Sequence, residues 1–309
     1  MLYTGFFWLK VFVSKIVLKE RVKKIMAYLQ CGARRLDLKS TQVMGILNVT
    51  PDSFSDGGKL FANDRVDMSE LLRKAEQMVE NGATILDIGG ESTRPNAAEV
   101  SIQEEMDRVL PALEVLSNNL DVVVSIDTSN AQLMIEASRS GAGLINDVRA
   151  LERPGALVAA ANSGLPVCLM HMQGTPKTMQ NNPQYDDVVE QVKGYLLERA
   201  AVCSDAGINK DNIILDPGIG FGKTLEQNLA LIANAKAFIE TGYLYLLGVS
   251  RKSMFAQLLG REVDERLAGG LATTAFAVMQ GASIVRVHDV KETADVVNVV
   301  EALKKGVNK

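Results

Sequence analysis

A set of polar side chains stands at or just beyond the ends of short apolar runs that are spread over most of the chain. Carboxylate and amide oxygens can accept the N–H groups of a ligand, and lysine, arginine and histidine side chains can hold an anion. One strand that ends in a polar residue says little, but nearly all of the apolar runs end in this way. The residues are Asn48, Asp87, Asp127, Asn146, His171, Asp216, Lys252, Arg286 and His288.

The apolar runs themselves have the pattern of parallel strands. Each is rich in Val, Ile or Leu and almost continuously apolar, which is typical of strands buried on both faces. Amphipathic stretches such as residues 68–82 and 186–207 lie between them, so the strands alternate with helices. The runs occupy residues 43–48, 84–89, 121–127, 143–147, 166–171, 212–216, 244–250 and 283–289.

This alternation predicts an α/β fold, a (β/α)8 TIM barrel in a single domain. The interval from one run to the next is about 34 residues, close to one βα unit of such a barrel. A doubly wound open sheet is the alternative, but it would not normally reach so many even repeats without a domain break. In a barrel the carboxyl ends of all strands meet at one mouth, which would gather the polar residues into one ring.

The first 30 residues fall outside this pattern. We expect residues 1–30 to be a short N-terminal extension that is not required for function, and residues 31–309 to form the barrel. Apolar runs occur within residues 1–18, but Lys10 and Lys15 interrupt them, and the segment is too short and too charged to span a membrane. A membrane-surface helix, a simple appendage and a true start at Met26 remain alternatives.

The composition excludes several classes of protein. The chain has 309 residues, 47% of them hydrophobic, so it can bury a full core. Its net charge of −4 gives no basic surface for a nucleic acid. The cysteine count is odd, with Cys31, Cys168 and Cys203, and no pair has C-x-x-C spacing. This argues against a disulfide framework and a thiolate zinc site, and it predicts a reducing, cytoplasmic compartment.

Several long motifs carry a resemblance to a known family. They are residues 45–58 (GILNVTPDSFSDGG), 87–95 (DIGGESTRP), 215–223 (LDPGIGFGK), 250–253 (SRKS) and 286–289 (RVHD). In order and in spacing they resemble the signatures of the dihydropteroate synthases, over about residues 43–305. The resemblance implies a transferase of folate biosynthesis that joins 6-hydroxymethyl-7,8-dihydropterin pyrophosphate to 4-aminobenzoate and releases pyrophosphate, by a dissociative route through a pterin methylene cation.

One motif also invites a different interpretation. Residues 217–224 (PGIGFGKT) look like the phosphate-binding loop of nucleotide hydrolases, whose consensus has a glycine four residues before the Gly-Lys-Ser/Thr. Here Pro217 occupies that place, so we interpret the string as a barrel loop. Its three glycines would let the backbone approach a flat ligand.

The resemblance assigns a role to each part of the polar ring. The pterin pyrophosphate would be bound by Thr93, Asp127, Asn146, Asp216, Lys252, Arg286 and His288. Mg²⁺ accompanies pyrophosphate in such enzymes, and Asn48 would supply an amide oxygen as its protein ligand. The 4-aminobenzoate pocket would be formed by Phe54, Thr93, Arg94, Pro95, Phe221, Lys252 and Ser253, and the catalytic residues would be Asp56, Arg94, Lys252, Arg286 and His288.

The partners implied are therefore the two small-molecule substrates, with no nucleic acid and no membrane. The resemblance also implies a homodimer and a target of sulfonamides. Two other functions stay open: a pterin-binding barrel of the methyltransferase type, and a pterin-binding protein without catalytic activity. The first would not need the SRKS and DSFSDGG strings, and a turnover assay would exclude the second.

Overall fold

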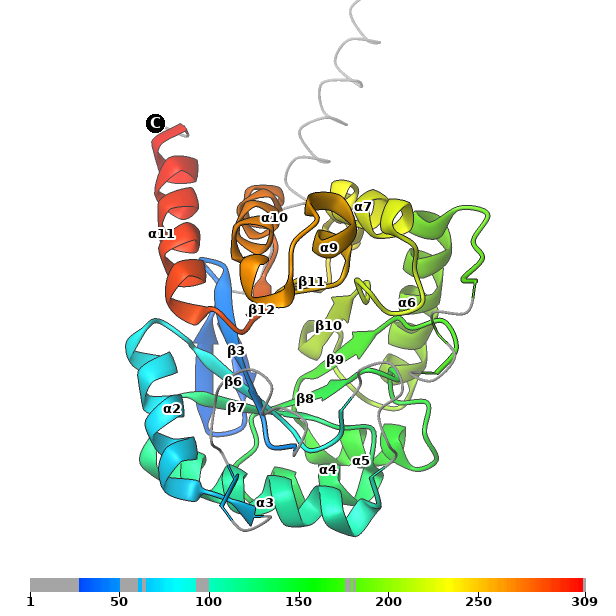
Figure 1. The fold of residues 1–309 in the computed structure, drawn as a ribbon. Helices are drawn as coiled ribbons and strands as arrows, with labels where there is room; N and C mark the ends of the chain where they lie inside the picture. Colours follow the sequence, from blue (N-terminus) through cyan, green and yellow to red (C-terminus); the bar gives the residue numbers. More distant parts are fainter. Residues whose placement is uncertain are drawn as a thin grey trace, which may run out of the picture.

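The computed structural model describes residues 28–50, 61–62, 65–92, 100–175, 179 and 182–307. Eight parallel strands close into a barrel in the order β10-β11-β12-β3-β6-β7-β8-β9. This confirms the predicted barrel, and each predicted apolar run overlaps one of its strands (Figure 1). The strands are β3 (Gln42–Asn48), β6 (Ile85–Gly89), β7 (Val123–Asp127), β8 (Leu144–Asp147), β9 (Val167–Met170), β10 (Ile213–Asp216), β11 (Leu244–Gly248) and β12 (Ile284–Val287).

Helices surround the barrel on its outside (Figure 1). Their ends follow local capping rules: Asp67 caps α2, and Ser101 and Thr224 begin α3 and α7 with capping boxes. The helices are α2 (Met68–Glu80), α3 (Ile102–Asn119), α4 (Ala131–Arg139), α5 (Ala156–Ser163), α6 (Val188–Asp205), α7 (Leu225–Ala233), α8 (Ala235–Ile239), α9 (Met254–Leu259), α10 (Leu267–Gln280) and α11 (Val290–Val307), with short 3-10 turns η2 (Lys210–Asn212) and η3 (Val263–Glu265). Two further short strands, β4 (Phe61–Ala62) and β5 (Arg65–Val66), pair antiparallel before α2.

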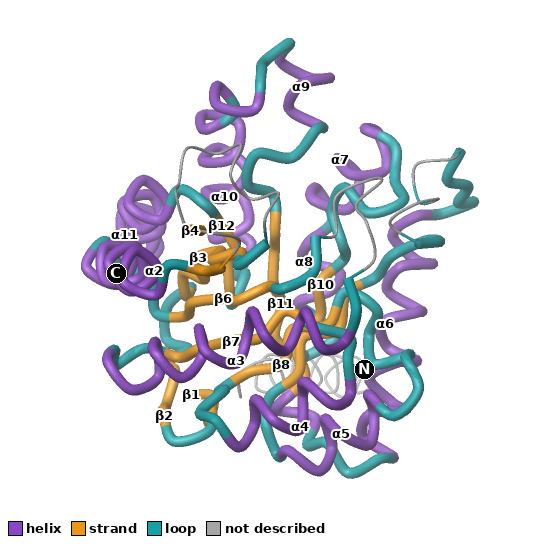
Figure 2. The backbone as a smooth tube through the Cα atoms, turned by 60° about the horizontal axis from the view of Figure 1, so that its bottom comes forward, coloured by secondary structure: helices purple, strands orange, loops and turns teal. Residues whose placement is uncertain are grey.

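A hairpin precedes the barrel and was not expected from the sequence. Its strands, β1 (Tyr28–Cys31) and β2 (Arg34–Asp37), pair antiparallel, and β2 contacts β7 (Figure 2). Leu29, Cys31 and Leu36 are buried. The boundary expected between residues 30 and 31 therefore falls inside β1.

The core has two layers, and the inner one explains the hairpin. Inside the barrel, one apolar side chain from each strand joins the buried side chains of the hairpin in a single cluster. The hairpin thus packs on the amino-terminal side of the strands and leaves the opposite end for polar residues. The strand residues of this cluster are Met44, Ile85, Val123, Leu144, Cys168, Ile214, Leu246 and Ile284. The larger outer cluster packs the other strand faces against the helices.

The described part of the chain contains no candidate membrane-spanning helix. None of the helices in that part of the chain combines the length and the apolar character needed to cross a bilayer.

Candidate active site

The strand period places the polar residues of the mouth. Successive side chains of a strand point to opposite faces, so residues two and four positions after the inner apolar layer point into the barrel again. Counted along each strand from its inner-layer residue, the second position is occupied by Asp87, Asn146, Asp216 and Arg286. The fourth position is occupied by Asn48 and Asp127. The polar ring expected from the strand ends therefore lies on the inner face of the barrel mouth.

Arg286 is the centre of one half of the ring. Its Nε donates to Asp87 Oδ2 over 2.6 Å, and its Nη2 donates to Asp127 Oδ2 over 2.9 Å. The Asn146 amide Nδ2 donates to the same Asp87 oxygen over 3.0 Å. These bonds join β12 to β6, β7 and β8 across the barrel.

The charges of this cluster shift one another's ionisation. Burial raises the pKa of Asp127 above its usual range, and the Arg286 charge opposes that shift. Burial alone would lower the pKa of Arg286, but the carboxylates of Asp87 and Asp127 raise it, so the guanidinium stays charged. The site thus holds a permanent cation between two inward-pointing carboxyl groups.

Two buried polar atoms lie unpartnered near this cluster. Within the described structure, Asp87 Oδ1 and Ser125 Oγ have no hydrogen-bond partner. Asp87 and Ser125 are register neighbours on β6 and β7, and both face the barrel interior. Buried polar atoms are normally hydrogen-bonded, so Asp87 Oδ1 and Ser125 Oγ stand out as unsatisfied polar positions on the inner wall of the barrel.

Asp216 and Lys252 form the other half of the ring. Asp216 Oδ1 accepts the Gly218 backbone N–H over 2.8 Å, which fixes the carboxylate at the end of β10. Burial raises the pKa of Asp216, while Lys252 and other nearby cations oppose the rise. Lys252 Nζ lies 4.1 Å from the ring centroid of Phe221.

The turn that contains Lys252 is bonded to the two residues that follow β12. His288 donates its backbone N–H to Ser250 Oγ over 3.1 Å, and its ring Nδ1 lies 3.1 Å from the same oxygen. Arg251 forms a two-point ion pair with Asp289 at 2.6 and 3.2 Å. Arg251 has a φ of 57°, unusual for a residue with a side chain, so these contacts hold a strained turn directly before Lys252.

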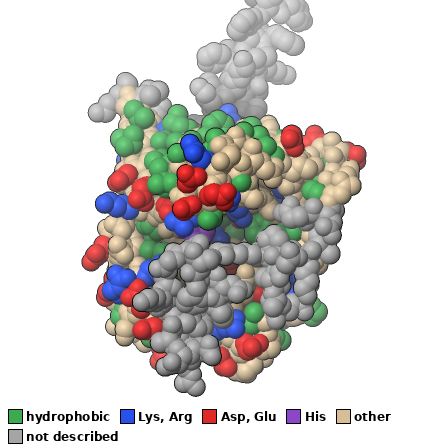
Figure 3. All heavy atoms as spheres, viewed as in Figure 1, with side chains coloured by type: hydrophobic (Ala, Val, Ile, Leu, Met, Phe, Trp, Pro, Cys, Tyr) green, Lys and Arg blue, Asp and Glu red, His purple; other side chains and the backbone are tan. Residues whose placement is uncertain are grey.

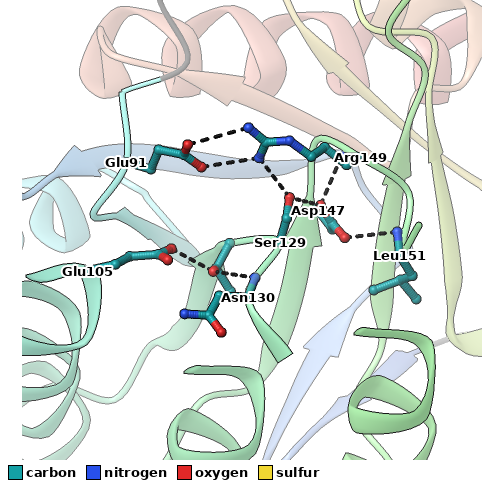
Figure 4. Close-up of polar contacts among 8 residues, drawn as sticks. Glu91, Glu105, Ser129, Asn130, Asp147, Arg149 and Leu151 are labelled. Atoms are coloured by element: carbon teal, nitrogen blue, oxygen red, sulfur yellow. Dashed lines mark hydrogen bonds and ion pairs between the residues drawn. The ribbon is translucent and has the colours of Figure 1, made fainter. Parts of the chain in front are cut away.

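A second polar network supports the mouth from the β7 and β8 side (Figure 4). Arg149 pairs with Glu91 at 3.1 Å and donates to Ser129 Oγ over 3.0 Å. Ser129 in turn donates to Asp147, whose Oδ2 accepts the Leu151 N–H over 2.8 Å. These bonds tie the segment that follows β6 to the turn after β8, so they fix the rim of the mouth.

Asn48 is the residue expected to bind a metal ion. It ends β3, and a Cβ added to Gly89 would lie 3.1 Å from Asn48 Oδ1, so the glycine leaves room beside that oxygen. Within the described ranges, no group of three or more His, Cys, Asp or Glu side chains is arranged to hold a metal ion. Asn48 therefore offers one amide oxygen, and a hard cation there would need oxygens of a bound ligand to complete its shell.

Comparisons with known proteins give the family. A sequence-family model described as a pterin binding enzyme matches residues 44–288. The dihydropteroate synthase of Escherichia coli (strain K12) is 54% identical over 267 residues, which cover 86% of this chain and 93% of that protein. The chain belongs to the dihydropteroate synthase family.

Solved dihydropteroate synthase structures share the fold. The Yersinia pestis dihydropteroate synthase, in a structure with a sulfonamide drug complex, superimposes with a TM-score of 0.86 at 50% identity. It covers 90% of this chain, which covers 99% of it. The Xanthomonas albilineans dihydropteroate synthase with 4-aminobenzoic acid superimposes with a TM-score of 0.83 at 43% identity, covering 90% of this chain and 98% of its own.

The structure brings together most of the site residues predicted from the dihydropteroate synthase motifs. The barrel mouth contains eight of them: Asn48, Asp127, Asn146, Asp216, Phe221, Lys252, Arg286 and His288. Ser253 is exposed and immediately precedes α9. Phe54, Asp56, Thr93, Arg94 and Pro95 lie outside the described residues.

Sequence reasoning missed the role of Asp87. It was expected only as a polar strand residue, although its carboxylate receives both Arg286 and Asn146. The signal that could have found it is its position: Asp87 is a charged residue inside a strand of five buried residues. A charge in such a place needs partners, and an inward-pointing cation is the strongest of them.

Proposed function

We propose that this member of the dihydropteroate synthase family catalyses the reaction of its family as a transferase. It joins 6-hydroxymethyl-7,8-dihydropterin pyrophosphate to 4-aminobenzoate, giving 7,8-dihydropteroate and pyrophosphate. The observation that carries the proposal is the cluster of Arg286, Asp87, Asp127 and Asn146 inside the barrel mouth. It presents acceptors for a flat N–H-rich ring beside a cation for an anionic leaving group.

The pterin edge is bound by acceptors whose orientation is already fixed. Asn146 donates its Nδ2 to Asp87, so its carbonyl oxygen remains as an acceptor for a ring N–H. Asp216 uses one oxygen for the Gly218 N–H, and its other oxygen accepts from the pterin amine and its neighbouring ring N–H. Lys252, whose Nζ lies over the Phe221 ring, donates to the pterin ring. Asp127 and Asp216 then favour a positively charged pterin.

The pyrophosphate lies toward Arg286, His288 and Asn48. Arg286 commits Nε and Nη2 to carboxylates, and its remaining N–H groups are donors for phosphate oxygens. Thr93 contributes beside them. We propose Mg²⁺ as the cofactor, held by Asn48, and when bound it neutralises charge on the leaving group.

The amine lies above the pterin, in a pocket bounded by Phe221, Lys252 and Ser253 and by Phe54, Thr93, Arg94 and Pro95 of the preceding loops. Asp56 and Arg94 complete the catalytic set with Lys252, Arg286 and His288. Aniline nitrogen is a weak nucleophile, so departure of pyrophosphate before attack is the proposed sequence. The chain's residues orient the two substrates and hold the leaving charge, and no covalent nucleophile is needed.

Sulfonamides compete with 4-aminobenzoate in this proposal, which the Yersinia pestis relative's structure with a sulfonamide drug supports. The substrates are small molecules, with no nucleic acid as partner. We also propose the cytoplasm as the compartment, which the free thiols of Cys31, Cys168 and Cys203 support.

The charge of Lys252 gives the proposal a pH dependence. Burial lowers the pKa of Lys252 to about 8, and Asp216 opposes the shift. The charged form of Lys252 donates to the pterin. The affinity of the protein for pterin pyrophosphate should therefore fall as the pH rises above about 8, by up to about tenfold per pH unit. The folded state binds fewer protons than the unfolded state between about 8 and the ordinary value of 10.5, so this group makes stability rise with pH in that window.

Calorimetric titration of the pterin pyrophosphate across this pH range measures the effect. Lys252→Arg keeps its charge and should flatten the profile. Parallel profiles for the two proteins would show that Lys252 does not set the pH dependence.

A homodimer is proposed through the outer helices α10 and α11. Hydrophobic side chains gather over these helices in the space-filling view (Figure 3). Phe276 and Met279 on α10 and Val299 and Leu303 on α11 are exposed, and the two helices contact each other. An apolar surface of this kind marks a site of association, and a second copy of the same surface is its simplest complement.

Introducing a charge on this surface should dissociate the dimer. Met279→Glu would bury an unpaired carboxylate between subunits, so the mass measured by light scattering after gel filtration should fall from two chains to one. Val158→Glu, on the exposed side of α5, is the matched control and should remain dimeric. A monomeric wild-type protein would refute the dimer.

One incorporation experiment separates the function from its two alternatives. Isotope-labelled 4-aminobenzoate should be incorporated into dihydropteroate when pterin pyrophosphate is present, as followed by mass spectrometry. A methyltransferase-type barrel would instead transfer a methyl group to a cobalamin protein, and a binding protein would retain the pterin without turnover. Either of these results would replace the proposed reaction.

A further inference from the structure

The lysine of the phosphate-loop-like string points into the protein, toward backbone carbonyl oxygens. Lys223 is 3% exposed, and its Nζ lies 2.9 Å from the carbonyl oxygens of both Gly218 and Phe221. It also lies 3.2 Å from the His171 carbonyl oxygen and 3.0 Å from His171 Nδ1. In a phosphate-binding loop the corresponding lysine reaches the phosphates, so this lysine has another task.

All four groups around the Lys223 ammonium are neutral acceptors. Burial lowers the pKa of Lys223 to about 7, and the Asp216 carboxylate opposes that shift. In its ammonium form Lys223 has donors and no acceptor, so His171 Nδ1 then accepts and the ring proton is on Nε2. Burial and the Lys223 charge lower the pKa of His171 to about 3, which keeps the ring neutral. The ammonium therefore resembles an internal metal cation that is coordinated by backbone carbonyls.

The glycines of the loop make this arrangement possible. Gly218, Gly220 and Gly222 have φ values of 66°, 83° and 63°, in the left-handed region that glycine adopts readily. A Cβ on Gly218 would lie 1.9 Å from the His171 oxygen, and one on Gly222 would lie 2.6 Å from the Gln173 oxygen. The glycines thus allow close packing against the segment after β9, and they let two loop carbonyls turn toward Lys223.

The same loop carries a wall of the candidate active site. Lys223 donates a hydrogen bond to the backbone carbonyl oxygen of Phe221. The aromatic ring of Phe221 in turn lies against Lys252 Nζ. A Cβ on Gly220 would lie 3.2 Å from Lys252 Cδ, so the loop backbone also packs along the Lys252 stem. A continuous chain of contacts therefore runs from Lys223 through Phe221 to Lys252.

We propose that Lys223 is a positioning residue for the reaction. Its ammonium gathers the carbonyls of the 217–223 loop and the segment after β9, and this fixes Phe221 and, through Phe221, the Lys252 ammonium. The kinetic test of this role uses the substrates of the proposed function and so rests on it. The effect of Lys223 on the order of the 217–223 loop does not depend on that function.

Lys223→Met removes the charge while keeping a side chain of similar length and volume. The KM for 4-aminobenzoate should rise about tenfold or more, because a buried set of charge-assisted hydrogen bonds is lost, while kcat should fall by a smaller factor. Lys210→Ala, at an exposed lysine of η2, is the control and should leave both constants unchanged. An unchanged KM in a folded Lys223→Met protein would overturn the proposal.

Hydrogen exchange tests the loop without any turnover. In the wild-type protein the Phe221 N–H donates to the Gly218 oxygen over 3.1 Å and the Gly220 N–H donates to Asn228 Oδ1 over 2.7 Å. A peptide covering residues 217–224 should exchange faster in Lys223→Met, whereas a peptide from α11 should not change. Equal exchange of the loop in both proteins would refute the inference, whereas a wild-type protein without turnover would refute the proposed function instead.

Chemical rescue covers the case in which Lys223→Met does not fold. In Lys223→Ala, added propylammonium can occupy the space of the missing side chain and supply its charge. Loop protection should return with propylammonium and not with propan-1-ol, which has a similar size and no charge. Equal rescue by both compounds would mean that Lys223 only fills space, and the positioning role would be withdrawn.

Discussion

Replacing Asp216 with asparagine should weaken binding of the pterin pyrophosphate by about 10- to 100-fold or more, because paired ring N–H groups lose a charged acceptor in a buried site. The substitution keeps the shape of the side chain and can preserve the bond from the Gly218 N–H to Oδ1. Isothermal titration calorimetry measures the loss, and Asp211→Asn, at an exposed position of η2, is a matched control that should bind normally.

The stability of the same variant should not fall along with its affinity. Burial raises the pKa of Asp216, which means that the folded protein holds this carboxylate at an energetic cost. Asparagine removes that cost, so the melting temperature should stay level or rise while binding falls. Near-wild-type affinity in Asp216→Asn would remove this residue from the pterin site, and a loss of folding would make the affinity uninformative about its role.

Arg286→Met should affect both stability and activity strongly. Asp87 has a fully buried side chain, and without Arg286 it would lose its cation and the 2.6 Å bond from Nε. Removing one member of a buried ion pair typically costs about 3–5 kcal/mol of unfolding free energy. The rate should fall by about a hundredfold or more, because the leaving pyrophosphate also loses its principal donor.

Urea denaturation and steady-state kinetics measure the two effects separately. The control is Arg73→Met, which breaks an exposed ion pair with Glu70 on α2 and should leave the denaturation midpoint nearly unchanged. The double variant Arg286→Met/Asp87→Asn should recover part of the lost stability without recovering activity, since the buried charge is removed but the anion site is not restored. A single variant with unchanged stability would contradict the buried pair.

The barrel was predictable because its strands are buried on both faces. A continuously apolar run such as residues 213–215 leaves few alternatives, and a polar residue such as Asp216 at the end of the run marks the mouth. The hairpin of β1 and β2 was not predictable in this way. Its four-residue strands alternate exposed and buried positions, and the pattern is too short to be distinguished from a loop.

The pairings inside the site could not be predicted, because they join residues that only the closed barrel brings together. Asp87 and Arg286 are far apart in the sequence, and nothing in either motif names the other as its partner. The direction of Lys223 is another example. The string GFGK gives no sign that the lysine turns inward, since this depends on the carbonyl of His171 in the segment after β9.

The most direct test of the central claim is pyrophosphate release by the purified protein, measured in a continuous coupled assay with pterin pyrophosphate and Mg²⁺. The account predicts that release requires 4-aminobenzoate, that it matches the dihydropteroate formed mole for mole, and that it is lost in Arg286→Met and strongly reduced in Asp216→Asn. Release of pyrophosphate at the same rate without 4-aminobenzoate, or no release with both substrates present, would contradict it.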